Sequence, residues 1–103
     1  MNEELKARFD RETREHDVVI YMKGNALFPR CGFSAAAVQL LQKHAPVHAV
    51  DVLAEPEVRE GIKEYTRWPT IPQVFIKGQF VGGADIVRDL EEKGELQKLI
   101  KSG

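Results

Sequence analysis

The sequence predicts an α/β fold, in which strands and helices alternate along one domain. Residues 18–22 form an apolar run and residues 47–52 show the alternation of a strand, and each segment is followed by one whose apolar residues recur at helical spacing. Two such units in succession imply a right-handed crossover between parallel strands. Residues 73–77 and 79–82 flank Gly78, which favours an antiparallel hairpin. A length of 103 residues fits a single domain over residues 1–103.

The remaining elements follow from the same spacing rule. Leu5 and Phe9 lie four positions apart among charges, which predicts a surface helix over residues 3–15. The unbroken apolar run at residues 18–22 predicts a strand that is buried on both faces. The residues that follow include glycine and proline, which predict a loop. Further helices are predicted at residues 33–44, 55–66, 84–93 and 95–101, the last two separated by Gly94.

The composition argues against several classes of partner. Fifteen Lys and Arg against sixteen Asp and Glu leave a formal net charge of −1, so no global field attracts nucleic acid or anionic lipid. No apolar run approaches the roughly 20 residues that a membrane span needs. Residues 1–16 contain acids, which transit peptides avoid. We therefore expect a soluble, cytoplasmic protein without nucleic-acid or membrane partners.

The chain has one cysteine, Cys31. A single thiol forbids an intrachain disulfide, a resolving-cysteine cycle and a four-thiolate metal site built from one copy. Lone cysteines are often inert, buried residues. Cys31, however, stands where a loop becomes a helix, follows Arg30 and has Lys23 across the loop, and these features stabilise a thiolate. Gly32 leaves room for a partner to approach, so the pattern favours a reactive cysteine.

Two further segments are candidates for shaping a site. Residues 68–73 (WPTIPQ) precede a predicted strand, and the residues alone favour a trans turn at Pro72, because only about 5% of X–Pro bonds in folded proteins are cis. Gly82 and Gly83 lead into a helix whose first turn carries Asp85. This second pattern fits either a flexible turn with a helix cap or an anion pocket lined by backbone N–H groups.

Taken together, these segments resemble one family. Residues 23–24 (KG), 31–34 (CGFS) and 68–73 (WPTIPQ), followed by Gly82, Gly83 and Asp85, look like the monothiol glutaredoxins of the CGFS type. The resemblance runs from about Leu5 to Ile100, with the blocks in family order and near family spacing. It implies the thioredoxin-like fold, a four-stranded mixed β-sheet flanked by helices, which agrees with the predicted layout.

The resemblance also implies glutathione as the ligand and Pro72 as the family's cis proline. The cysteinyl backbone of glutathione is expected to pair with the main chain of Ile71 as an added strand would. Its glycyl carboxylate should meet two bases, which could otherwise be ordinary solvated charges. Its γ-glutamyl end should meet backbone N–H groups and a carboxylate. The candidate glutathione-binding residues are Lys23, Arg59, Thr70, Ile71, Pro72, Gly83, Ala84 and Asp85, whereas Trp68, Thr70 and Gln73 could contribute only by shaping the groove.

Members of this family bind a [2Fe-2S] cluster, which takes four ligands that are usually thiolates. One chain offers only Cys31, so two chains and two glutathiones would complete the set. The resemblance therefore implies Cys31 as catalytic residue and metal ligand, and a homodimer bridged by the cluster. It implies a carrier that delivers the cluster to recipient apo-proteins in iron–sulfur cluster assembly and iron homeostasis. A BolA-like partner that uses the surface around Cys31 is also implied.

The alternative function is that of a glutathione-dependent thiol–disulfide oxidoreductase. Ser34 stands where dithiol members carry a second cysteine, and a hydroxyl cannot resolve a mixed disulfide at neutral pH, so we expect this activity to be weak. Ala84 stands where many members have another cysteine, and residues 25–26 (NA) replace Ser or Thr followed by Pro, which predicts a less rigid loop before Cys31. The histidines lack metal-ligand spacing with Cys31 and are interpreted as surface or edge residues: His16, His44 and His48.

Overall fold

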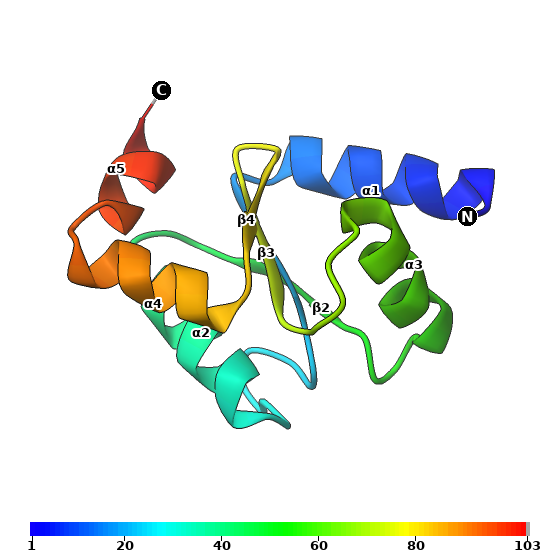
Figure 1. The fold of residues 1–103 in the computed structure, drawn as a ribbon, viewed down its shortest axis with the longest axis horizontal. Coiled ribbons are helices and arrows are strands. Elements are labelled where there is room, and N and C mark those ends of the chain that lie inside the picture. Colours follow the sequence, from blue (N-terminus) through cyan, green and yellow to red (C-terminus); the bar gives the residue numbers. More distant parts are fainter. Residues whose placement is uncertain (103) are drawn as a thin grey trace.

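A four-stranded mixed sheet forms the centre of the structure, a computed structural model that describes residues 1–102 (Figure 1). In chain order the elements are α1 (Glu3–Glu15), β1 (Val18–Met22), α2 (Gly32–Gln42), β2 (His48–Asp51), α3 (Pro56–Thr66), β3 (Gln73–Ile76), β4 (Gln79–Gly82), α4 (Ala84–Glu92) and α5 (Leu96–Lys101). The strand order is β2-β1-β3-β4. Strand β1 is parallel to β2 and antiparallel to β3, which is antiparallel to β4. The predicted parallel pair and hairpin are therefore confirmed.

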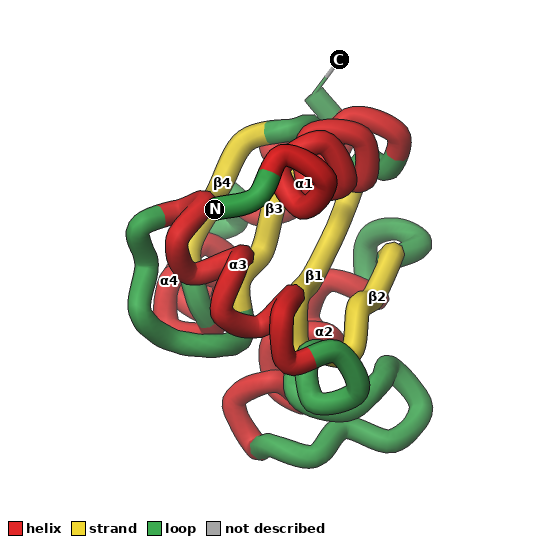
Figure 2. Tube along the Cα trace, turned by 90° about the vertical axis from the view of Figure 1, so that its right-hand side faces the viewer, coloured by secondary structure: helices red, strands yellow, loops and turns green. Residues whose placement is uncertain are grey.

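Different helices cover the two faces of the sheet. Helices α1 and α3 lie on one face and α2, α4 and α5 on the other, and Figure 2 views the molecule from the side of α1 and α3. The alternation of side chains along β1 explains this division. Val18 and Ile20 pack with α2, α4 and α5, whereas Val19 and Tyr21 pack with α1 and α3. All of β1 is buried, as the apolar run predicts.

The ends of the elements lie close to their predicted positions, and local chemistry explains the largest difference. Helix α2 ends at Gln42 instead of His44, because Pro46 lacks the N–H that would donate to the Gln42 carbonyl if the helix continued. The amides of His44 and Ala45 both donate to the Leu41 carbonyl, at 3.1 and 3.3 Å. Between β3 and β4 the chain turns at Lys77 and Gly78, whose φ angles are 54° and 80°. Positive φ at both central residues is typical of a two-residue hairpin turn, so the tight connection predicted at Gly78 also includes Lys77.

Three segments that are distant in the sequence meet at one end of the molecule. They are the start of α2, the loop between α3 and β3, and the start of α4, which together line one pocket. The end of β1 joins the start of α2 there, because the Lys23 amide donates to Ser34 Oγ at 3.1 Å. The candidate site therefore lies where four elements converge. Within residues 1–102, no helix combines the length and apolar character needed to cross a membrane.

Candidate functional site

Cys31 occupies the N-cap position of α2, which begins at Gly32. Its backbone is extended, with φ −151° and ψ 135°, and its side chain is partly exposed. The prediction that Cys31 stands where a loop becomes a helix is thus confirmed. A Cβ built on the neighbouring Gly32 would meet no atom within 4 Å, so the space beside the thiol is open. The thiol is accessible to a second molecule.

The environment lowers the pKa of the Cys31 thiol below its ordinary value. The main cause is a hydrogen bond from the backbone N–H of Ser34, and the Phe33 amide and the charge of Lys23 act in the same direction, while partial burial opposes them. Arg30 is exposed and is not one of the main causes, so the sequence prediction is supported for Lys23 and stays a prediction for Arg30. A larger thiolate fraction makes Cys31 a better nucleophile and metal ligand.

The side chain of Ser34 has a structural role. It is fully buried, and its Oγ accepts the hydrogen bond from the Lys23 amide. This contact ties the end of β1 to the first turn of α2 and so holds Lys23 near the thiol. The Ser34 hydroxyl also helps to lower the pKa of the Cys31 thiol.

The loop that leads to Cys31 closes through its own backbone. Gly24 has φ +85°, and a Cβ there would lie 2.5 Å from the Phe28 carbonyl oxygen, so this position requires glycine. The Gly24 amide donates to Asp51 Oδ1 at 3.0 Å. Asn25 Oδ1 accepts from the amides of Leu27 and Phe28, both at 2.9 Å. The loop therefore forms a closed turn in which the Asn25 side chain supplies the hydrogen bonds.

Large apolar side chains are exposed on both sides of Cys31. Leu27 is 84% exposed, Phe28 70% and Phe33 64%. We call these three residues the apolar rim. Clustered exposed apolar side chains indicate a surface that binds another molecule. Sequence reasoning did not identify the rim, although two large apolar residues in a loop rich in turn-forming residues were a visible signal.

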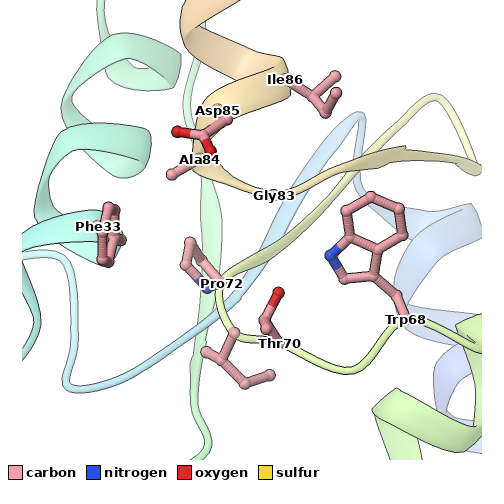
Figure 3. Close-up of a pocket in the computed structure, with 9 residues that line it drawn as sticks. Phe33, Trp68, Thr70, Pro72, Gly83, Ala84, Asp85 and Ile86 are labelled. Atoms are coloured by element: carbon pink, nitrogen blue, oxygen red, sulfur yellow. The ribbon is translucent and has the colours of Figure 1, made fainter.

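A pocket with a cavity volume of about 430 Å³ lies next to this surface (Figure 3). It is enclosed by the start of α2, the loop before β3 and the start of α4. Sequence reasoning did not assign Phe33 or Ile86 to the site, and it gave Trp68 only a shaping role, yet all three line the pocket. The candidate glutathione-binding residues that line it are Thr70, Ile71, Pro72, Gly83, Ala84 and Asp85.

The loop before β3 is held from the inside by Gln73. The Gln73 side chain is fully buried, and its Nε2 donates to the carbonyls of Trp68, at 2.9 Å, and Thr70, at 3.2 Å. The amide and carbonyl of Ile71 form no hydrogen bond within residues 1–102. The Ile71–Pro72 bond is cis, as the resemblance implies. The trans turn favoured by the residues alone is wrong, because local sequence does not carry the packing that selects the isomer.

The start of α4 presents backbone donors to the pocket. Gly83 precedes the helix, and no side chain caps it. Asp85 is exposed and pairs with Arg88 at 3.1 Å, so its carboxylate does not cap the helix. The first intrahelical bond runs from Val87 to Gly83, which leaves the amides of the three preceding residues unpaired within the helix. Of the two interpretations of residues 82–85, this geometry favours the anion pocket.

The two predicted basic ligands lie outside the lining of the pocket. Lys23 is close enough to Cys31 for its charge to lower the thiol pKa. Arg59 lies on α3, forms no ion pair within residues 1–102, and its Nε is buried without a hydrogen-bond partner. Buried polar groups are nearly always paired, so an unpaired guanidinium nitrogen points to a partner from outside the chain. The assignment of both bases to glutathione stays a prediction.

The histidines form side-chain contacts away from the thiol. His44 contacts Glu91 at 2.8 Å, and His48 contacts Glu12 at 3.3 Å and stacks on His16. Within residues 1–102, no three His, Cys, Asp or Glu side chains are arranged to hold a metal ion. A metal at Cys31 therefore needs ligands from outside one copy of the chain.

Known proteins with similar sequences and structures are glutaredoxins. The glutaredoxin family model matches residues 18–81. A ycf64-like monothiol glutaredoxin of Synechocystis is 50% identical over 98% of this chain and 95% of its own length. Glutaredoxin 4 of Escherichia coli K12 is 44% identical over 91% of this chain and 83% of its own. The chain spans only 49% of the rice mitochondrial monothiol glutaredoxin-S4.

The structural comparison agrees with the sequence comparison. The solution structure of reduced poplar apo GrxS14 matches with a TM-score of 0.83 and 44% identity, over 94% of this chain and 90% of that one. The mixed sheet with flanking helices is thus the thioredoxin-like fold that glutaredoxins share. The fold class predicted from the sequence is confirmed.

Proposed function

Because the chain belongs to the glutaredoxin family and resembles its monothiol members along most of its length, we propose that it binds glutathione beside Cys31 and carries a [2Fe-2S] cluster between proteins. One observation carries the proposal: the single thiol of the chain is partly exposed, has a lowered pKa and lies two residues before Phe33, which lines a pocket together with the unpaired backbone donors at the start of α4. Since thiols stay reduced in the cytoplasm, we place this role there.

The polar groups around the pocket complement the groups of glutathione. The free amide and carbonyl of Ile71 can pair with the cysteinyl main chain of the tripeptide. At the start of α4, backbone amides suit the α-carboxylate of the γ-glutamyl residue, and Asp85 suits its amine. Lys23 and Arg59 suit the glycyl carboxylate, and neither forms an ion pair within residues 1–102. The glutathione thiol is thereby directed towards Cys31.

The number of thiols determines how many chains and glutathiones the proposed complex contains. A [2Fe-2S] cluster takes four ligands, usually thiolates, and each chain supplies one. Two copies of Cys31 and two bound glutathiones complete the set, so the cargo bridges a homodimer. The apolar rim flanks Cys31 in the sequence, and its exposed side chains would be covered between the copies. Because two of the ligands belong to an exchangeable small molecule, the cluster can pass to a recipient apo-protein in iron–sulfur cluster assembly and iron homeostasis.

The proposal is tested by anaerobic reconstitution with iron, sulfide and glutathione. We expect the visible absorption of a cluster together with a dimer in size-exclusion chromatography. Both should be lost in Cys31→Ser, and also when S-methylglutathione replaces glutathione, because its sulfur cannot serve as a thiolate. Ala36→Ser is a matched control, since it adds a hydroxyl at an exposed position on the same helix. A cluster that persists in Cys31→Ser or with S-methylglutathione would contradict the proposal.

The lowered pKa and exposure of Cys31 also favour a second function, the reduction of glutathionylated proteins. The Cys31 thiolate would attack the glutathione sulfur of the mixed disulfide, and the protein thiolate would leave and take up a proton. A second glutathione thiolate would then attack the Cys31 mixed disulfide, which forms oxidised glutathione and restores the Cys31 thiolate. Rapid steady-state turnover by a colourless monomer would favour this enzyme over the carrier.

A BolA-like protein is a further proposed partner, and the exposure of the apolar rim supports it. Such a partner would cover the same surface as a second copy of the chain. A heterodimer that forms with the native chain and is lost in Phe28→Asp would support this role, and it is compatible with the carrier. A heterodimer that is unaffected by this substitution would place the partner elsewhere.

A further inference from the structure

The side chain of Trp68 contains a buried donor without a partner. Its indole Nε1 is inaccessible to water and forms no hydrogen bond within residues 1–102. More than nine in ten buried polar groups in proteins are hydrogen-bonded, and an unpaired one calls for an explanation. A binding pocket next to the donor offers one, because a ligand can bring the missing acceptor.

The indole nitrogen faces the pocket. Figure 3 shows that the edge of the Trp68 ring that carries the nitrogen points towards Thr70, Pro72 and Gly83. A Cβ built on Gly83 would lie 3.6 Å from Nε1 and 3.3 Å from the Pro72 carbonyl oxygen. Glycine at this position therefore keeps the space between the indole and the start of α4 free of side chains.

The ring is held in this orientation. The backbone amide of Trp68 donates to Thr66 Oγ1 at 3.2 Å, and its carbonyl accepts from Gln73 Nε2 at 2.9 Å. The ring packs against Phe80 in an edge-to-face arrangement, with 5.6 Å between the ring centroids. Because the backbone of Trp68 is hydrogen-bonded and its ring packs against Phe80, turning the indole N–H towards water would break these contacts. The donor is thus fixed where a ligand acceptor must come to it.

We propose that the indole N–H of Trp68 donates a hydrogen bond to the α-carboxylate of the γ-glutamyl residue of bound glutathione. This inference rests on the proposed function, because it names an additional contact for the same ligand. The indole N–H and the amides at the start of α4 are all donors, and Trp68 and the first residues of α4 line one pocket. A carboxylate accepts several hydrogen bonds at once and matches this set.

The position of the donors selects between the two carboxylates of glutathione. The glycyl carboxylate is assigned to Lys23 and Arg59, neither of which lines this pocket. The γ-glutamyl carboxylate is the one that reaches the start of α4. Trp68 is therefore a specificity-determining residue that distinguishes glutathione from a thiol tripeptide without this carboxylate.

The first test uses the fact that Trp68 is the only tryptophan in the chain, so the protein gives a single indole N–H signal in NMR. Oxidised glutathione converts Cys31 to its mixed disulfide: the Cys31 thiolate attacks one sulfur, and one glutathione leaves as a thiolate and takes up a proton. We expect the indole proton to shift downfield in this adduct. The matched adduct with 4-aminobutanoyl-Cys-Gly, which lacks only the α-carboxylate, should leave the indole signal at its ligand-free position.

The second test is Trp68→Phe, which keeps an aromatic ring against Phe80 and removes the donor. We expect the equilibrium constant for the mixed disulfide with glutathione to fall about tenfold, as for the loss of one hydrogen bond to a charged group. The constant for 4-aminobutanoyl-Cys-Gly should not change. Tyr65→Phe is the control, because it removes a polar hydrogen from an aromatic ring on α3 that does not line the pocket.

The outcomes separate this inference from the proposed function. If the glutathione adduct forms and perturbs the amides of Ile71 and Ala84, while the indole signal stays in place and Trp68→Phe behaves as the native chain, the contact is overturned and glutathione binding stands. If neither protein forms an adduct or a complex with glutathione, both proposals fail together.

Discussion

At the scale of single residues, the reactivity of Cys31 comes mainly from the backbone of its own helix. The Ser34 amide is the largest cause of the lowered thiol pKa, and the Phe33 amide assists it. Lys23 is the charged side chain that adds to this effect, and it is held near the thiol by the hydrogen bond from its amide to Ser34 Oγ. The helix start therefore activates the thiol, and one lysine strengthens that activation.

We predict that Lys23→Met raises the pKa of Cys31 while leaving it below that of an ordinary thiol, because the backbone donors remain. The rate of alkylation by iodoacetamide, measured against pH, reports the thiolate fraction. Its midpoint should move to higher pH in Lys23→Met and stay in place in Arg30→Met. An equal shift of the midpoint in the two variants would show that the charge of Lys23 affects the thiol pKa no more than that of Arg30.

At the scale of elements, the loop before β3 depends on one amide side chain. Besides donating to the carbonyls of Trp68 and Thr70, Gln73 accepts from Thr66 Oγ1 at 2.8 Å. Because these carbonyls point inwards to Gln73, the loop is held with the polar backbone groups of Ile71 free. Gln73 therefore connects the end of α3 to the wall of the pocket, although it does not line the pocket itself.

We predict that Gln73→Leu lowers the free energy of unfolding by about 1–3 kcal/mol, because buried carbonyls lose their donor. Urea denaturation measures this change. Gln79→Leu is the matched control: Gln79 is exposed in β4, and surface substitutions of this kind change stability by less than about 0.5 kcal/mol. Equal losses in both variants would mean that the hydrogen bonds of Gln73 do not stabilise the loop.

At the scale of the whole molecule, ion pairs join helices on each face of the sheet. Arg8 of α1 donates to both carboxylate oxygens of Glu55, at 2.8 and 3.1 Å, just before α3 begins. This hydrogen bond is the main cause that holds the pKa of Glu55 below its ordinary value. On the other face, Lys43 and His44 at the end of α2 contact Glu91 of α4, at 2.9 and 2.8 Å. These contacts make part of the stability depend on pH.

We predict that Glu55→Gln lowers the free energy of unfolding at pH 7 by less than about 1 kcal/mol, since the pair is partly exposed to solvent. A carboxylate with a depressed pKa stabilises the fold above its unfolded-state pKa, and this contribution is lost as the pH falls through the folded-state pKa. In urea denaturation, the difference between native chain and variant should therefore shrink as the pH falls below the ordinary pKa of a glutamate. Glu92→Gln, which removes an exposed carboxylate without an ion pair within residues 1–102, should show no such dependence.

The order of helices and strands and the position of Cys31 at a helix start were predictable, because periodic apolar residues and glycine or proline breaks act over a few neighbouring residues. The count of one cysteine is likewise a property of the sequence alone. The family motif then identified six residues that prove to line one pocket. The cis bond at Pro72 was predictable only from that motif, and not from local chemistry.

Tertiary structure alone decided which side chains are buried, free or paired. The amino-acid types at Trp68, Arg59 and Asp85 do not reveal that the first two have unpaired buried nitrogens or that the third pairs with Arg88. Hydrogen-bond satisfaction depends on every group within a few ångströms, and those groups come from segments that are distant along the chain. Sequence patterns describe neighbours along the chain, whereas burial and pairing are set by neighbours in space.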